Sequence, residues 1–264
     1  MEQGLAPKTC NLRLTAIRAF LEYAAQEYLW IMPVYTDACT IVGVKTTNHA
    51  IEYFEPNEMT ALLAAPSGNN KTDRRNQMIL IFLYDTAARV AEARQVKVSD
   101  LHLDAEVPYV TLLGKGRKYR NIPLMDKTIL HLKRFLKDFH GSELKTDMPL
   151  FYSKIHGQVH ELSSDTFEKM IKRYAAQCRA GGYLMPDNVH CHMIRKTRAM
   201  DLYREGVPLT HIQQLLGHEN ISTTSGFYAF ATLDVLAKAM EIVNPDNGVK
   251  SWSNPDTLER LYRL

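Results

Sequence analysis

The stretch LLGHENISTTSGFY, residues 215–228, decides how the rest of the chain is interpreted. It carries His218 directly after a glycine, and Tyr228 ten positions later. The stretch HMIRKT, residues 192–197, supplies its nearest chemical partners, His192 and Arg195. Further upstream, TAARVAE at 86–92 carries an arginine, Arg89, and the glycine-flanked turn GKG at 114–116 carries Lys115. Arginine, lysine, histidine, arginine, histidine and tyrosine therefore follow one another in this order.

The positive charge of the chain is concentrated rather than large. The 32 Lys+Arg stand against 29 Asp+Glu, which gives a net charge of only +3. The length of 264 residues suffices for one large hydrophobic core or two modest ones. Residues 115–120 hold four cations and 195–198 hold three, with no acid in either stretch. Such clusters bind phosphates, although each alone is equally well explained as a solvated face.

Four widely spaced cysteines form no CxxC pair, which argues against a disulfide framework or a zinc ribbon and fits a reducing cytosol. The most apolar run, 78–84, is far shorter than the roughly 20 residues that span a bilayer, and the N-terminus has no signal-peptide pattern. We therefore expect a cytoplasmic protein without membrane association.

The apolar periodicity predicts mostly helices. An amphipathic helix is expected over 8–27, and an irregular linker over 37–54. A new unit then starts at Pro56, and a helix over 75–91 should carry Arg89 near its far end.

Residues 107–123 have the pattern of a β-hairpin, with strands over 109–113 and 119–123 and a basic tip between them. Helices should follow over 126–139, with Asp126 as cap, and over 164–180, 193–205 and 208–216, with a last one around 233–243. The expected fold is mainly α with a small antiparallel β-sheet.

The chemistry of these residue types points to phosphodiesters. Opening a DNA strand without a metal requires a nucleophile, positive charge on the phosphoryl group and an acid for the leaving 5′-oxygen. Guanidinium groups bind two phosphate oxygens at once, so we assign phosphate binding to Arg89 and Arg195. Each residue alone has an ordinary explanation in packing, capping or an ion pair, for example Arg89 with Glu92; the conjunction favours function.

The ordered set resembles the tyrosine recombinase (phage integrase) family over about residues 9–228, most specifically in HxxR at 192–195 and LGH at 216–218. The resemblance implies a nucleophilic Tyr228, Lys115 as general acid, His192 handling the tyrosine proton, and His218 bonded to a phosphate oxygen. It implies a recombinase or integrase, such as one of a phage or mobile element, that cuts and rejoins DNA through a 3′-phosphotyrosyl link. No cofactor, metal or ATP is implied.

The resemblance also implies domains and partners. Residues 1–36 are expected to be the truncated end of an all-α core-binding domain, 37–54 a linker, and 55–264 the catalytic domain with its C-terminal helix and tail. The expected partner is double-stranded DNA, bound by a homo-tetramer on two sites through the C-terminal helix, 232–243, in the bacterial nucleoid. Candidate DNA contacts are Lys8, Arg13, Arg18, Arg117, Lys118, Lys172 and Arg173.

Three positions depart from the family pattern. His218 and Tyr228 are one position further apart than is common, Lys196 stands where a second histidine is frequent, and Ala87 stands where glycine is. Three other functions compete with a recombinase: a type IB topoisomerase, a DNA-binding module without catalysis, and a metalloenzyme with ligands drawn from 190–192 and His218.

Overall fold

The computed structural model describes residues 4–46, 52–141 and 145–217. The chain divides into two compact units, Met1–Ile51 and Glu52–Leu264. The expected C-terminal helix, His218 and Tyr228 lie outside the described residues. Within the described parts, no helix combines the length and the apolar character that crossing a membrane requires.

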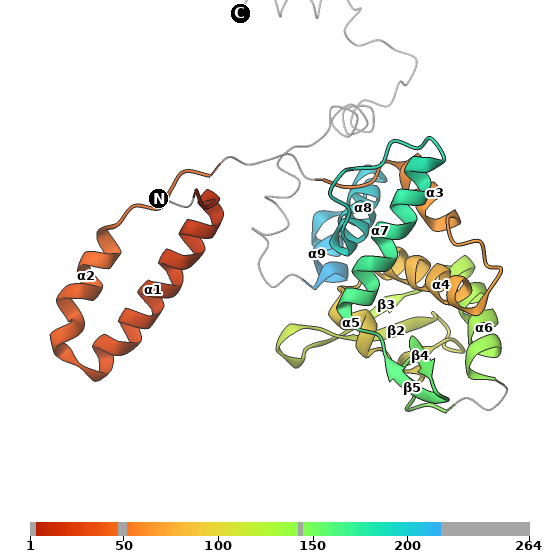
Figure 1. The fold of residues 1–264 in the computed structure, drawn as a ribbon. Coiled ribbons are helices and arrows are strands. Elements are labelled where there is room, and N and C mark those ends of the chain that lie inside the picture. Colours follow the sequence, from red (N-terminus) through yellow and green to blue (C-terminus); the bar gives the residue numbers. More distant parts are fainter. Residues whose placement is uncertain (1–3, 47–51, 142–144, 218–264) are drawn as a thin grey trace, which may run out of the picture. The chain divides into compact units, whose positions relative to one another are not determined.

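The first unit is a pair of helices. Helix α1 (Pro7–Glu27) agrees with the predicted helix, and a 3-10 turn, η1 (Leu29–Ile31), leads into α2 (Met32–Thr40), which packs against it (Figure 1). The linker expected from residue 37 therefore begins only after Thr40. The sequence reasoning missed α2, in which Pro33 stands in the first turn, as suits a helix start, and Arg18 binds the carbonyls at its C-terminal end.

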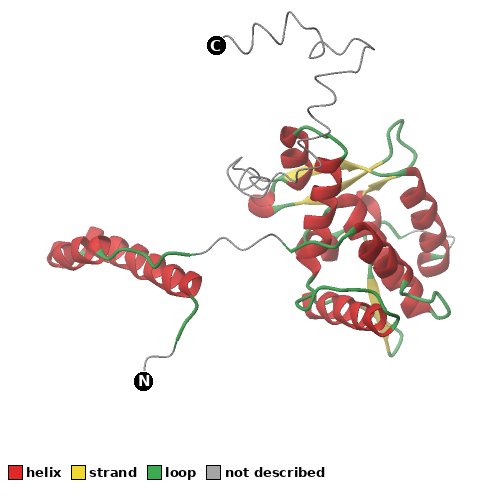
Figure 2. Cartoon of the chain, turned by 90° about the horizontal axis from the view of Figure 1, so that it is seen from above, coloured by secondary structure: helices red, strands yellow, loops and turns green. Residues whose placement is uncertain are grey.

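The second unit consists mostly of helices with two small antiparallel sheets (Figure 2). Its elements after the linker are helical first: α3 (Pro56–Ala64), α4 (Lys71–Thr86), α5 (Val90–Gln95) and the 3-10 turn η2 (Val98–Asp100). The three-stranded sheet follows, in the order β1 (Leu101–His102), β2 (Tyr109–Leu113) and β3 (Tyr119–Pro123), with the 3-10 turn η3 (Lys115–Arg117) at the tip of β2 and β3.

The remaining elements are α6 (Asp126–His140), the hairpin of β4 (Tyr152–Ile155) and β5 (Gln158–Glu161), α7 (Ser164–Ala180), α8 (Cys191–Arg204) and α9 (Leu209–Leu216). Both strands of the predicted hairpin and both ends of α7 agree with the sequence-based expectation. Asp126 is the first residue of α6 rather than its cap, because Met125 takes the extended cap conformation. The β4–β5 hairpin was not predicted.

The core of this unit surrounds α4, which lies between α6 and α8 (Figure 1). Its buried side chains, among them Phe82 and Leu83, join those of α7 and α8 and the inward face of the sheet, Val110, Leu112 and Ile122. A smaller cluster packs α9 against α8 through Ile212 and Leu216. This packing places the C-terminal end of α9 next to the chain segment that follows α4.

The entry of the chain into this unit is fixed to α8. Phe54 is fully buried, and its backbone N–H donates to Oγ1 of Thr197 at 2.9 Å. The Thr197 hydroxyl in turn donates to the carbonyl of Met193, 2.9 Å away. A buried backbone donor is thus satisfied by a side chain of the helix that carries His192 and Arg195.

Candidate active site

Arg89 lies at a break between two helices, not near the end of one long helix as the sequence predicted. Helix α4 ends at Thr86 because Ala87 adopts a left-handed conformation, with φ 48°. This conformation favours glycine, the residue that the resemblance implies at this position. Arg89 then takes the extended N-cap conformation of α5, and its N–H donates to Oε2 of Glu92 at 2.7 Å.

Glu92 is the centre of the site. Its side chain is 3% exposed and accepts a hydrogen bond from Nη1 of Arg89 at 2.8 Å. It also accepts hydrogen bonds from Nη1 and Nη2 of Arg120, at 2.7 Å each. Burial by itself raises the pKa of this carboxyl group, but the hydrogen bonds and charges of Arg120 and Arg89 outweigh it and lower the pKa to about 2. Glu92 is therefore ionised at neutral pH.

Arg195 reaches the same carboxylate from α8. The residue is 2% exposed, and its Nη1 lies 3.9 Å from Oε2 of Glu92. The same nitrogen donates to the carbonyl of Ala87 at 2.7 Å, in the break after α4. The structure thus brings together the two arginines that the sequence assigned to phosphate binding. We call Arg89, Arg120, Arg195 and Glu92 the Glu92 cluster.

The three arginines of the cluster bind three consecutive carbonyl oxygens at the end of α9. Arg120 Nε donates to Leu215 at 3.1 Å, Arg195 Nη2 to Leu216, and Arg89 Nη2, at a long 3.5 Å, to Gly217. The last carbonyls of a helix have no partner within it and carry partial negative charge. The cluster therefore fixes the residue immediately before His218.

His192 stands in the first turn of α8 and is exposed. Partial desolvation, followed by the positive charges of Arg195 and Lys196, lowers its pKa to about 4. The two neighbouring cations act in the same direction as desolvation, since both disfavour the charged imidazolium. The imidazole is neutral at pH 7, so one of its nitrogens can accept a proton.

Lys115 lies exposed at the tip of the β2–β3 hairpin, together with Arg117 and Lys118. Its neighbour Gly114 lies against the Glu92 cluster, because a Cβ atom added at 114 would be 3.3 Å from Nη1 of Arg120 and 3.6 Å from Oε1 of Glu92. The end of β2 that leads into the turn therefore contacts the cluster, and the turn carries the lysine into solvent.

The other candidate DNA contacts differ in their surroundings. Lys8, Arg13 and Lys172 are exposed on α1 and α7. Arg18, by contrast, donates to three carbonyls at the end of α2, and Arg173 donates to the Tyr174 hydroxyl at 2.7 Å. Arg18 is thus engaged within the helix pair, whereas Arg173, although bonded, remains exposed.

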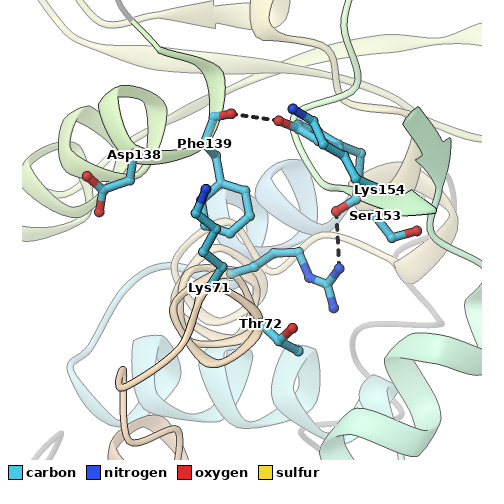
Figure 3. Close-up of a pocket in the computed structure, with 8 residues that line it drawn as sticks. Lys71, Thr72, Asp138, Phe139, Ser153 and Lys154 are labelled. Atoms are coloured by element: carbon cyan, nitrogen blue, oxygen red, sulfur yellow. Dashed lines mark hydrogen bonds between the residues drawn. The ribbon is translucent and has the colours of Figure 1, made fainter. Parts of the chain in front are cut away.

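A hollow elsewhere in this unit has no part in the site. Figure 3 shows it between α4, α6 and β4, lined by Lys71, Thr72, Asp138, Phe139, Ser153 and Lys154 together with Arg75 and Tyr152. Arg75 donates to the Tyr152 carbonyl at 3.1 Å, and the Tyr152 hydroxyl donates to the Phe139 carbonyl at 2.6 Å. None of the four candidate catalytic residues that the structure describes, Arg89, Lys115, His192 and Arg195, lines this hollow.

The described residues also bear on the metalloenzyme alternative. In the part of the chain that the structure describes, no group of three or more His, Cys, Asp or Glu side chains is arranged to hold a metal ion. Cys191 is buried, and this burial together with the nearby Glu168 raises the pKa of its thiol, which disfavours the thiolate that a metal would need.

Two members of the cluster were not identified from the sequence. Glu92 was considered only as an ordinary ion-pair partner of Arg89, and Arg120 only as part of a basic hairpin. A signal for Glu92 exists, since an acidic side chain three residues after an N-cap caps a helix. A signal for Arg120 is its alternation with Ile122 on the inward face of β3.

The phage integrase family model matches residues 52–232. The putative integrase/recombinase y4rC of Sinorhizobium fredii is 30% identical over 96% of this chain and 74% of its own length. Tyrosine recombinase XerD of Halalkalibacterium halodurans is 31% identical over 84% of this chain and 71% of its own length.

Solved structures agree in fold. The Tn1549 transposon integrase in complex with a circular intermediate DNA aligns with a TM-score of 0.69 at 19% identity, over 92% of this chain and 81% of that one. The XerH site-specific recombinase bound to a palindromic difH substrate aligns with a TM-score of 0.62 at 23% identity. This alignment covers 88% of this chain and 72% of that one. The mainly helical fold with small antiparallel sheets, preceded by N-terminal helices, is therefore confirmed.

Proposed function

Because the chain belongs to the phage integrase family and is a site-specific tyrosine recombinase, which cleaves and rejoins DNA, we propose that it does so with one active site formed by Arg89, Lys115, His192, Arg195, His218 and Tyr228. The observation that supports this assignment most directly is the Glu92 cluster. It joins Arg89 and Arg195, which are 106 positions apart in the numbering, at the end of α9 and directly before His218.

The two arginines neutralise the phosphoryl group. A guanidinium carries five N–H donors, so the bonds of Arg89 to Glu92 and Gly217 leave donors for a non-bridging phosphate oxygen. The Arg89 side chain is 34% exposed, which permits access to DNA, whereas the Arg195 side chain is buried. His218 adds a hydrogen bond to a phosphate oxygen.

Cleavage transfers the phosphoryl group from DNA to protein. The phenolic oxygen of Tyr228 attacks the phosphorus atom, and the bond from phosphorus to the 5′-oxygen breaks. Neutral His192 accepts or positions the phenolic proton, and Lys115 protonates the leaving 5′-oxygen. The product is a 3′-phosphotyrosyl ester and a free 5′-hydroxyl.

Rejoining reverses these steps. A 5′-hydroxyl of another strand attacks the phosphotyrosyl phosphorus, and the tyrosine leaves with its proton restored. The ester keeps the energy of the broken phosphodiester, so the reaction needs neither ATP nor a divalent ion. The role in the cell is that of a phage or mobile-element integrase, which acts on the DNA of the nucleoid in the cytoplasm.

The proposed assembly is a homo-tetramer on two double-stranded DNA sites, joined by the segment 232–243. One solved relative, the lambda integrase, is described as a dimer bound to a core site. The apolar residues of 232–243, at helical spacing, support docking of this segment into a neighbouring subunit.

The test is incubation of the protein with DNA flanking its own gene, followed by mapping of the covalently attached nucleotide. Tyr228→Phe should bind the same DNA and form no covalent adduct, while the matched control Tyr262→Phe should form it as the parent protein does. Adduct formation should persist in excess EDTA. Recombinant junctions between two sites indicate a recombinase, and relaxation of supercoils alone indicates a topoisomerase. An adduct in Tyr228→Phe would refute the nucleophile.

A further inference from the structure

Arg120 lies on β3 with its side chain directed into the unit. It pairs with Leu112 across the sheet and shares the inward face with Ile122, two residues further on. The Arg120 side chain is 13% exposed. An arginine on the buried face of a strand requires partners for its charge and its donors, because an unpaired buried charge is strongly unfavourable.

The partners of Arg120 come from two other segments of the unit. Its Nη1 and Nη2 form a two-pronged pair with Glu92 on α5, and its Nε donates to the carbonyl of Leu215 on α9. This geometry uses the planar fork of a guanidinium, which a lysine does not offer. A single side chain thus connects β3, α5 and α9.

Two glycines lie against the Arg120 side chain. A Cβ atom added at Gly217 would be 3.2 Å from Cδ and 3.3 Å from Nη1 of Arg120, and Gly217 has a left-handed φ of 61°. A Cβ atom at Gly114 would be 3.3 Å from the same Nη1. Gly114 immediately precedes Lys115, and Gly217 immediately precedes His218.

We propose that Arg120 is a positioning residue, which holds the backbone before Lys115 and the backbone before His218 against Glu92 and so sets both side chains relative to the arginines that bind phosphate. This inference rests on the proposed function. Arg120 touches neither DNA nor the reacting atoms in this role; it acts through Glu92, Gly114 and Gly217. Its loss should impair cleavage while DNA binding remains.

The variants are Arg120→Gln, Arg120→Lys and the matched control Arg94→Gln. Arg94 is a half-buried arginine on α5 that donates to the carbonyl of Leu162 at 2.5 Å and to the Ser164 hydroxyl at 3.2 Å, away from the cluster. Thus Arg94→Gln also removes a partly buried guanidinium. A fourth variant, Glu92→Gln, is made alone and together with Arg120→Gln.

The first measurement is single-turnover cleavage of a nicked duplex that carries the site mapped with the parent protein. Arg120→Gln should cleave about a hundredfold more slowly, as expected for a misplacement of about 1 Å, with DNA affinity within threefold of the parent. Arg120→Lys restores the charge without the fork and should recover less than a tenth of the lost rate. Arg94→Gln should cleave as the parent does.

A double-mutant cycle separates positioning through Glu92 from a general loss of stability. If Arg120 acts through Glu92, Arg120→Gln should slow cleavage by less than threefold in the Glu92→Gln background. Fully additive effects, full recovery by Arg120→Lys, or equal loss in Arg94→Gln would each overturn the inference.

The second measurement needs no DNA and is amide hydrogen exchange followed by mass spectrometry. Arg120→Gln should accelerate exchange in residues 209–217 and 109–123, and Arg94→Gln should leave both segments unchanged. Unchanged exchange in Arg120→Gln refutes the positioning role even if cleavage slows. If the parent protein forms no adduct on any flanking DNA, the proposed function fails and the catalytic role of Arg120 fails with it, while accelerated exchange still supports the structural contact.

Discussion

Glu92→Gln should destabilise the protein at pH 7 by about 3 kcal/mol. The substitution keeps the shape of the side chain but replaces a carboxylate oxygen by an amide that donates hydrogen bonds. That amide would face N–H donors of Arg89 or Arg120 and leave cationic groups uncompensated. Breaking a buried ion pair by removing one partner costs about 3–5 kcal/mol.

The lowered pKa of Glu92 reflects the same contacts and gives a stabilisation of the same order. A lowering from 4.5 to about 2 corresponds to about 3 kcal/mol, at about 1.4 kcal/mol per unit. Because the pKa in the folded state is depressed, this stabilisation is present above the pKa of the unfolded state, near 4.5, and is lost as the pH falls towards 2. Glu92→Gln should therefore be less stable than the parent at pH 7, and its unfolding free energy should vary less between pH 4.5 and 2 than that of the parent.

Urea unfolding followed by far-UV circular dichroism, at pH 7 and at intervals down to pH 3, measures both effects. Glu161→Gln on β5 removes an exposed carboxylate and is the control, with an expected change below about 0.5 kcal/mol. An unfolding free energy of Glu92→Gln within 1 kcal/mol of the parent value at pH 7 would show that the carboxylate does not organise the three arginines.

Three further outcomes can be measured, one on the parent protein and two on single variants. Covalent adduct formation at a nicked site should be constant from pH 8 to about 5 and should fall as the pH drops through about 4, since the lowered pKa keeps His192 neutral. A fall that is already centred near pH 6.5 would contradict this assignment. Arg195→Lys should retain DNA binding but slow cleavage at least tenfold, because an ammonium group cannot bind the Ala87 and Leu216 carbonyls in the same fork; cleavage at the parental rate would exclude this explanation. Thr197→Val should lower the unfolding free energy by about 1–3 kcal/mol, because it leaves the buried N–H of Phe54 unpaired. Thr197→Ser keeps the hydroxyl and is the control, and equal stability of the two variants would count against that hydrogen bond.

Much of the fold could be predicted from local patterns. The β2–β3 hairpin follows from alternation on both sides of a glycine-containing turn, and α7 follows from its apolar period, with Ser163 capping its start and Gly181 at its end. These signals lie within the segments themselves, so neighbouring elements do not alter them.

Other features depend on tertiary contacts and were missed for that reason. The break at Ala87 has no local signal, because alanine favours helix and the left-handed turn is held by the Arg195 bond to its carbonyl. The strands of β4 and β5 are short, and β5 is exposed throughout, so alternation does not mark it. The contact between Arg120 and Glu92 joins residues 28 positions apart and becomes visible only when β3 is placed beside α5.

In the proposed active site, the arrangement of the cluster would let the arginines be fixed in place and still attract a phosphate. A second carboxylate would orient the guanidinium groups equally well but would cancel their charge. Here the carbonyls of Leu215, Leu216 and Gly217 orient them as neutral acceptors, and in the part of the chain that the structure describes one carboxylate, Glu92, pairs with all three cations. The excess positive charge therefore remains beside the end of α9, where a phosphodiester would be bound with its orienting donors already in position. It also follows that replacing one of these arginines by a neutral side chain disturbs two properties at once, the charge offered to the phosphate and the backbone that leads into His218.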